Sequence, residues 1–225
     1  MSSQYERELR QVLAGIPKGV DSVIRSCSPV EKEKMRLVIK RPFLVVRAAG
    51  SGMEGTGDLL ALRGDFSFPI EVKSTRAQKL YLSGRTKLQY EAMVNEGERC
   101  RLMPLYAHRR KGVRGDSWRI FRVETSNLSG RLRKLSNSIP AFPLNRNGSV
   151  YLNWDDGMPL NEFISLVCSS AGTDSSNLHE LEVRAIRKDI FSPQLPSTRV
   201  EELQLAQKIP QAPLDVFAEL RRRRS

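Results

Sequence analysis

The sequence GDLLALRGDFSFPIEVK, residues 57–73, decides the fold class, because it holds two adjacent β-strand patterns joined by a tight turn. Residues 59–62 form a short apolar run, and the Gly-Asp pair that follows is typical of a hairpin turn. Over residues 65–73 apolar and polar side chains alternate, so one face of this strand is apolar and the other carries Glu71 and Lys73. The sequence therefore predicts a hairpin with one face for a core and one polar face.

Patterns on both sides of this hairpin predict a mixed α/β fold. Apolar residues at helical spacing predict helices over 5–14, 29–40 and 86–97. Further apolar runs predict strands over 43–46, 102–107 and 118–123, the first of them buried on both faces. Tyr106, Trp118 and Phe121 are predicted to lie in the core. This order of elements favours a mixed central β-sheet flanked by helices.

Composition divides the chain of 225 residues into three parts. Residues 1–124 hold the predicted sheet and its helices. Residues 125–168 are rich in Ser and Asn around one compact hydrophobic stretch, which suggests a small C-terminal appendage. Residues 169–225 are rich in Ser and hold scattered prolines, so we expect an extended, partly disordered tail.

The positive charge is concentrated in the first half. The chain has a net charge of +12, and residues 1–124 hold 24 basic and 14 acidic side chains. A basic surface of this size attracts polyanions through phosphate contacts, so we expect nucleic acid to bind to the first half. The run Arg221–Arg224 has two interpretations, a nucleic-acid-binding arm or a solubilising end.

Several classes of function are excluded by what the sequence lacks. No apolar run is long enough to span a bilayer and the first ten residues are polar, so we expect no membrane partner and a cytoplasmic location. The three cysteines are far apart, which argues against a disulfide framework or a cysteine-rich zinc site. Two histidines are too few for a multi-histidine metal site. We expect the chemistry to use carboxylates and lysine.

Three charged residues of the hairpin suggest a metal site. Asp58 precedes one strand, and Glu71 and Lys73 share one face of the next. Two close carboxylates bind a hard divalent cation such as Mg²⁺, and a neighbouring lysine can position a water for attack at phosphorus. The alternative is an ordinary half-exposed antiparallel strand, for which Pro69 would suit a sheet edge.

These motifs resemble those of a known family. The pair Gly57-Asp58 followed by Ile70-Glu71-Val72-Lys73 is similar to the PD-(D/E)xK motif of restriction-endonuclease-like nucleases. Four further segments in the same order resemble the archaeal Holliday junction resolvases: Tyr5–Leu9, Val46–Ser51, Leu80–Leu82 and Trp118–Arg119. The resemblance covers residues 5–10 and 43–123. It implies a nuclease core in residues 1–124.

The resemblance implies roles for individual residues. Glu6, Asp58, Glu71 and the carbonyl of Val72 would bind Mg²⁺, for which Mn²⁺ would substitute. Lys73 would position the attacking water and stabilise the charge that develops on the phosphate. No small-molecule cofactor is expected.

The third carboxylate has two candidates. Glu6 lies in a segment, Tyr5–Leu9, whose sequence resembles that of the family. It precedes Arg47 by 41 residues, however, which implies an insertion around residues 15–33. Glu31 has the usual spacing from Arg47, but the residues around it do not match the family motif. Either glutamate could instead simply stabilise the N-terminus of a helix. Arg47 and the catalytic Ser51 would lie beside the scissile phosphate.

The resemblance also implies a substrate and a partner. Family members are homodimers that place two active sites on opposing strands of a four-way DNA junction and resolve it by paired nicks in recombination and repair. Either Tyr81 or Phe68 would then lie on the dimer or junction surface. The residues expected to bind DNA phosphates are Arg47, Lys79, Arg85, Lys87, Arg109, Arg110, Lys111 and Arg114.

Two other functions stay open at the level of sequence. One is a PD-(D/E)xK nuclease that acts on a different DNA shape. The other is a non-catalytic nucleic-acid-binding protein, in which the carboxylates lie on a solvated face. We therefore expect a magnesium-dependent endodeoxyribonuclease of the resolvase type, with these two as alternatives.

Overall fold

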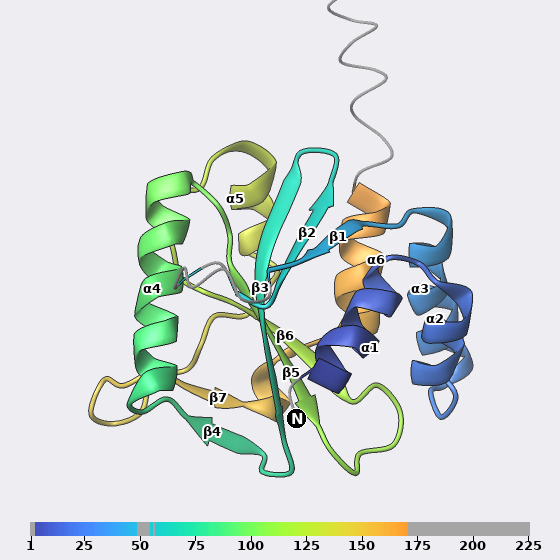
Figure 1. The fold of residues 1–225 in the computed structure, drawn as a ribbon, viewed down its shortest axis with the longest axis horizontal. Helices are drawn as coiled ribbons and strands as arrows, with labels where there is room; N and C mark the ends of the chain where they lie inside the picture. Colours follow the sequence, from blue (N-terminus) through green and yellow to red (C-terminus); the bar gives the residue numbers. More distant parts are fainter. Residues whose placement is uncertain (1–2, 49–54, 56, 171–225) are drawn as a thin grey trace, which may run out of the picture. The chain divides into compact units, whose positions relative to one another are not determined.

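The computed structural model describes residues 3–48, 55 and 57–170 (Figure 1), all of which fall within the first of its two units, Met1–Asp174. Its helices are α1 (Ser3–Leu13), α2 (Pro17–Val23), α3 (Pro29–Lys40), α4 (Arg85–Cys100), α5 (Gly130–Ser136), the 3₁₀ turn η1 (Trp154–Asp156) and α6 (Leu160–Ser170). Its strands are β1 (Leu44–Arg47), β2 (Leu59–Arg63), β3 (Phe66–Thr75), β4 (Lys79–Tyr81), β5 (Leu105–Arg110), β6 (Trp118–Arg122), β7 (Tyr151–Asn153) and β8 (Met158–Pro159). No helix in these ranges is long and apolar enough to cross a membrane.

The central sheet is mixed, as predicted. Its strand order is β1-β2-β3-β5-β6-β8, with β3 parallel to β5 and all other neighbours antiparallel. Helix α4 lies on one face, and α1, α2, α3 and α6 lie on the other (Figure 1). A separate two-stranded ribbon joins β4 to β7. The mixed α/β class is therefore confirmed.

Strand β3 lies in the middle of the sheet, between β2 and β5, and its apolar side chains are buried. Phe68 is fully buried and its ring centroid lies 5.8 Å from those of Phe66 and Phe163, so its predicted surface position is wrong. Strand β3 is not an edge strand, although Pro69 itself lies where the sheet has a strand on one side only. Pairing with β5 begins only at Ile70, so Pro69, which has no N–H to donate, has a strand neighbour on the β2 side alone.

The prediction that residues 43–46 are buried on both faces is wrong. In the described residues β1 pairs with β2 alone, and the side chains of Leu44 and Val46 are 66% and 48% exposed. Phe43 is buried just before the strand begins. An apolar run predicts a strand, but it does not say whether the strand lies at the centre or at the edge of a sheet.

The start of α3 follows the prediction closely. Ser28 is the N-cap and Pro29 occupies the first turn. The Ser28 hydroxyl accepts a hydrogen bond from the Glu31 N–H at 3.3 Å, and the Glu31 carboxylate accepts one from the Ser28 N–H at 2.7 Å. This reciprocal pair is a capping box, so the Glu31 carboxylate satisfies the helix N-terminus.

The segment 125–168, which the sequence suggests is an appendage, shares the core of the first 124 residues. The reason is that α6 buries a continuous apolar face in the same cluster as α1, α3 and the sheet, and β8 adds a strand next to β6. The buried residues of that face are Leu160, Phe163, Ile164 and Val167. Of the tail expected at 169–225, all but the first two residues lie outside the described ranges.

Asp116 fastens α6 to the loop before β6. Its side chain is almost fully buried, and Oδ2 accepts hydrogen bonds from the backbone N–H and the side-chain amide of Asn161, both at 2.8 Å. Oδ1 accepts a third from the Trp118 N–H at 3.1 Å. A buried carboxylate with three donors can stabilise the ends of two elements at once.

Removing this carboxylate should destabilise the fold. Asp116→Ala leaves the Asn161 donors buried without an acceptor, and we expect the free energy of unfolding to fall by about 3 kcal/mol. Urea denaturation followed by circular dichroism measures the change. The control is Asp156→Ala, which removes an exposed carboxylate four residues before α6. It should change the free energy of unfolding by less than about 0.5 kcal/mol. Equal losses in the two variants would contradict the role of Asp116.

Candidate active site

One open cavity, with a volume of about 490 Å³, gathers the four charged residues expected to act in catalysis, together with two of the basic residues expected to bind DNA. It lies where β3, the residue before β2, and the helices α1 and α4 meet. Its lining residues are Glu6, Asp58, Glu71, Val72, Lys73, Ser74, Arg85, Gln89 and Lys111.

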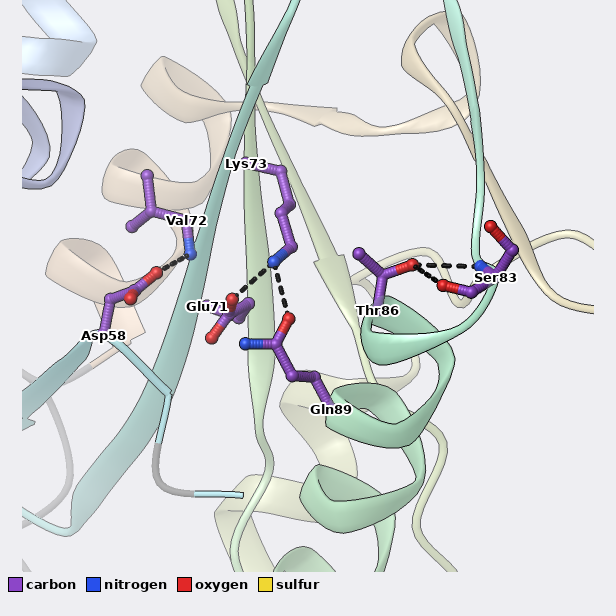
Figure 2. Close-up of polar contacts among 7 residues, drawn as sticks. All are labelled: Asp58, Glu71, Val72, Lys73, Ser83, Thr86 and Gln89. Carbon is purple, nitrogen blue, oxygen red and sulfur yellow. Dashed lines mark hydrogen bonds and ion pairs between the residues drawn. The ribbon is translucent and has the colours of Figure 1, made fainter. Parts of the chain in front are cut away.

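Glu71 and Lys73 lie on one face of β3, as the two-residue period predicts. The Lys73 Nζ lies 2.6 Å from the Glu71 Oε1 and donates a second hydrogen bond to the Gln89 Oε1 at 2.9 Å (Figure 2). The side chains of Lys73 and Glu71 are only 18% and 6% exposed. The ammonium group is therefore held in one place by a strand neighbour and by a side chain of α4.

Asp58 is held against the same strand from the other side. Its backbone N–H donates to the Ile70 carbonyl at 2.9 Å, and its Oδ2 accepts from the Val72 N–H at 2.8 Å (Figure 2). Burial, and next the negative charge of Glu71, raise the pKa of Asp58 to about 6, and the charge of Glu6 acts in the same direction. Such repulsion among carboxylates is relieved when a cation binds.

Glu6 reaches this cavity from α1. It is 7% exposed, and its Oε2 accepts hydrogen bonds from the Arg47 Nη2 at 3.0 Å and Nε at 3.2 Å. Glu31 does not line the cavity, and its carboxylate is taken up by the α3 capping box. The segment between Glu6 and Arg47 contains α2 and α3, and the fold of these helices leaves the two side chains in contact despite their separation in sequence.

The donor set of the cavity fits Mg²⁺. In the described ranges no three His, Cys, Asp or Glu side chains lie close enough together to form a metal site by themselves. Asp58 and Glu71 with the Val72 carbonyl would supply only part of a coordination sphere. That suits Mg²⁺, which binds through one or two carboxylates and keeps several waters. The raised pKa of Asp58 shows that the site already favours an added positive charge.

The predicted phosphate-binding residues do not all come together. Arg85 and Lys111 line the cavity, and Arg47 contacts Glu6. Arg109 is ion-paired with Glu8 at 2.7 Å. The remainder lie elsewhere: Lys79, Lys87 and Arg114 are exposed, and the Arg110 guanidinium is 5.5 Å from the Trp154 ring centroid. Ser51 lies outside the described residues.

Gln89 and Ser74 are the cavity residues that the sequence analysis missed, and of the two Gln89 holds Lys73. It follows Lys73 by 16 residues, and its contact depends on how α4 crosses the sheet. No motif spacing predicts that crossing. The one available signal was its position in the first turns of the helix that follows the Glu-x-Lys strand.

Comparison with known proteins agrees with the motifs. The model of the archaeal Holliday junction resolvase (Hjc) family matches residues 22–133. Among solved structures, Archaeoglobus fulgidus Hjc, a Holliday junction resolvase from an archaeal hyperthermophile, has 19% sequence identity and a TM-score of 0.39. That match covers 60% of this chain and 97% of that chain. No curated protein matches. The predicted family resemblance is confirmed, and it supports a junction-resolving nuclease.

The family match and the cavity differ in one respect. The matched segment begins at residue 22, so it contains Glu31 but not Glu6. The side chain that lines the cavity is nevertheless Glu6. A sequence match follows spacing along the chain, whereas the lining of a cavity depends on distances in space, so the two need not select the same glutamate.

The Asp58 carboxyl should titrate above the usual range of an aspartate. In metal-free protein we expect the Asp58 carboxyl to titrate at about pH 6. Glu71→Gln removes a like charge that disfavours the ionised form, so the pKa of Asp58 should fall. Carbon-13 NMR titration of the carboxyl groups in the presence of a chelator measures both values. Glu162→Gln, far along the chain on α6, is the control, and an Asp58 that titrates near pH 4 in the unmodified protein would contradict the geometry.

Proposed function

We propose that this chain is a Mg²⁺-dependent endodeoxyribonuclease that resolves four-way DNA junctions by paired nicks. The observation that carries the proposal is the convergence of Asp58, Glu71 and Lys73 with Glu6 in one open cavity. Asp58, Glu71 and Lys73 also lie within the segment that matches the junction resolvase family. Glu6 adds a carboxylate from outside that segment.

Asp58, Glu71 and the Val72 carbonyl would hold the metal. When bound, Mg²⁺ supplies a Lewis acid for a phosphate oxygen and lowers the pKa of a coordinated water. Asp58 is fixed for this task by the Val72 N–H, so its free oxygen can face the cavity. Glu6 adds negative charge nearby and orients Arg47 toward an incoming phosphate.

Lys73 would position the attacking water. Its Nζ has three donors, and the Glu71 and Gln89 side chains accept two of them. These two hydrogen bonds fix the direction of the third N–H of Nζ, which can donate to a water or a phosphate oxygen. A pre-positioned ammonium also stabilises the negative charge that develops on the phosphate in the transition state.

The DNA would be bound through its backbone. Arg85 and Lys111 line the cavity, and contacts of this kind recognise shape rather than sequence. A homodimer would present two such cavities to opposing strands of the junction, which is how paired nicks arise. Binding should accordingly weaken steeply as the salt concentration rises.

The first experiment is cleavage of an end-labelled immobile four-way junction beside a duplex and a single strand of the same sequence. We expect paired nicks on opposing strands with Mg²⁺, none with EDTA, and little cutting of the duplex. Equal cutting of all three substrates would indicate a nuclease of another specificity. Binding without cutting would indicate a non-catalytic DNA-binding protein.

Asp58→Asn should separate cleavage from binding. The substitution removes a metal ligand but leaves the basic residues in place, so we expect cleavage to fall at least about a hundredfold while junction affinity changes by less than about threefold. Single-turnover cleavage and a gel-shift titration measure the two quantities. An Asp58→Asn protein that cleaves normally would refute the assignment of the site.

The two candidate glutamates form a matched pair of variants. Glu6→Gln should lower the cleavage rate by about tenfold or more, because it removes a charge next to Asp58 and the orientation of Arg47. Glu31→Gln should leave cleavage unchanged, since glutamine also completes a capping box. Single-turnover rates on the junction test both. Loss of cleavage in Glu31→Gln with normal cleavage in Glu6→Gln would reverse the assignment.

A further inference from the structure

A pair of stacked tyrosines stands on the β4–β7 ribbon. Tyr81 of β4 is the direct cross-strand partner of Tyr151 of β7. Their ring centroids are 5.5 Å apart with an interplanar angle of 23°. Tyr81 is 59% exposed although it is a large aromatic side chain. Tyr151 is half-buried beneath it, so the pair offers mainly the Tyr81 ring to solvent, an uncommon use of residues that dominate cores and interfaces.

The ribbon is anchored from below, so the rings are held in one orientation. The next pair along the strands, Leu80 and Leu152, lies on the opposite face of the pleat and packs in the second hydrophobic cluster. The Tyr151 N–H donates to the Pro143 carbonyl at 3.1 Å, which ties β7 to the chain before it. The stacked rings therefore face away from the core on a fixed support.

Exposed basic side chains lie within six residues of Tyr81 along the chain. Lys79 is exposed and lies two residues from Tyr81, on the same face of β4. Arg85 and Lys87 are exposed at the start of α4, and Arg85 also lines the catalytic cavity. Lys87 has an acidic neighbour, Glu91, at 3.6 Å. Two acidic side chains, Asp155 and Asp156, follow β7, so the basic groups that could meet a polyanion lie on the side of β4 and the start of α4.

The turn between β4 and α4 fixes the distance from the rings to the cavity. The Thr86 hydroxyl accepts a hydrogen bond from the Ser83 N–H at 2.9 Å and donates to the Ser83 carbonyl at 2.8 Å (Figure 2). Arg85 is the fourth residue after Tyr81, so their Cα atoms are at most about 14 Å apart. That is about four base steps along one strand. DNA held at the cavity would therefore reach the rings.

We propose that the Tyr81–Tyr151 pair is a stacking platform for a base exposed at the branch point of the DNA. The inference rests on the proposed function and deepens it, because it names what distinguishes a junction from a duplex. Bases within a continuous duplex are covered by their neighbours, whereas a branch point interrupts the stack. Every base offers a face for aromatic stacking, so the platform recognises branching without recognising sequence.

Half of this platform comes from outside the family segment. Tyr81 lies within the matched residues 22–133, but Tyr151 and all of β7 lie beyond them. The segment 125–168 thus supplies the second ring and the strand that holds the first. Residues Leu152 and Val150 of this segment also pack beneath the ribbon.

The test compares affinities for an immobile junction and for a duplex of the same sequence, with EDTA present to prevent cleavage. We expect Tyr81→Ala to weaken junction binding by about tenfold and to leave duplex binding unchanged. Tyr81→Phe keeps the ring and should bind like the unmodified protein. Tyr81→Leu keeps apolar bulk without a ring and should bind like Tyr81→Ala. Leu88→Ala removes an exposed apolar side chain of α4, 57% exposed, and is the matched control.

Crosslinking gives a second readout that does not depend on affinity. A junction with 5-iodouracil at the branch point should crosslink on irradiation to Tyr81 or Tyr151, as mapped by mass spectrometry. A crosslink confined to other residues would overturn the platform. The platform would also be overturned if Tyr81→Ala weakened junction and duplex binding equally, or weakened neither. A change of oligomeric state in sedimentation would overturn it too, because the rings would then contact a second copy of the chain.

Failure of the platform and failure of the proposed function give different results. If the unmodified protein cleaves the junction in pairs but Tyr81→Ala binds it normally, only the platform fails. If the unmodified protein binds the junction no better than the duplex, the platform fails together with the junction substrate. If Tyr81→Ala loses junction binding but the unmodified protein cleaves nothing, the platform stands and the nuclease proposal fails.

Discussion

The ion pair between Glu71 and Lys73 is the interaction on which the site depends. Burying two charges is unfavourable unless each keeps hydrogen-bonding partners, and here the ammonium has both the carboxylate and Gln89. The apolar side chains of α4 pack against the sheet, and this packing brings Gln89 within reach of Lys73. Asp58 is held at the same place by the Val72 N–H. The charge of the cavity thus depends on the polar side chains of β3 and on the partners that hold them.

Sequence predicted best those features that depend on near neighbours. The alternation along β3, the capping box of α3 and the clustering of Asp58, Glu71 and Lys73 all follow from residues at most 15 positions apart. Glu6 was preferred over Glu31 only because of the sequence motif around it, and Glu6 is the one of the two that lines the cavity. Where a periodic pattern and a hydrogen-bonding partner lie close in sequence, local physics is sufficient.

The failures all concern contacts between distant parts of the chain. The apolar run of β1 was expected at the centre of the sheet because hydrophobicity does not reveal strand order. Phe68 was expected near the surface, but α6 covers it with Phe163, 95 residues later. Gln89 was missed because its role depends on the crossing of α4 over the sheet. Residues 125–168 were expected to form an appendage because their composition differs from that of residues 1–124. In the structure the apolar face of α6 packs in the same core as those residues.

The placement of charges on alternate positions of β3 has a consequence for folding as well as for chemistry. If β3 slipped by one residue against β2, the pleat would turn Glu71 and Lys73 into the apolar layer and Ile70 and Val72 into the cavity. Burying these charges without Asp58, Gln89 or water would be strongly unfavourable. The charged residues of the cavity therefore also favour the native register of β3 against β2. A variant that neutralises both charges would lose this discrimination between the native register and its nearest competitor.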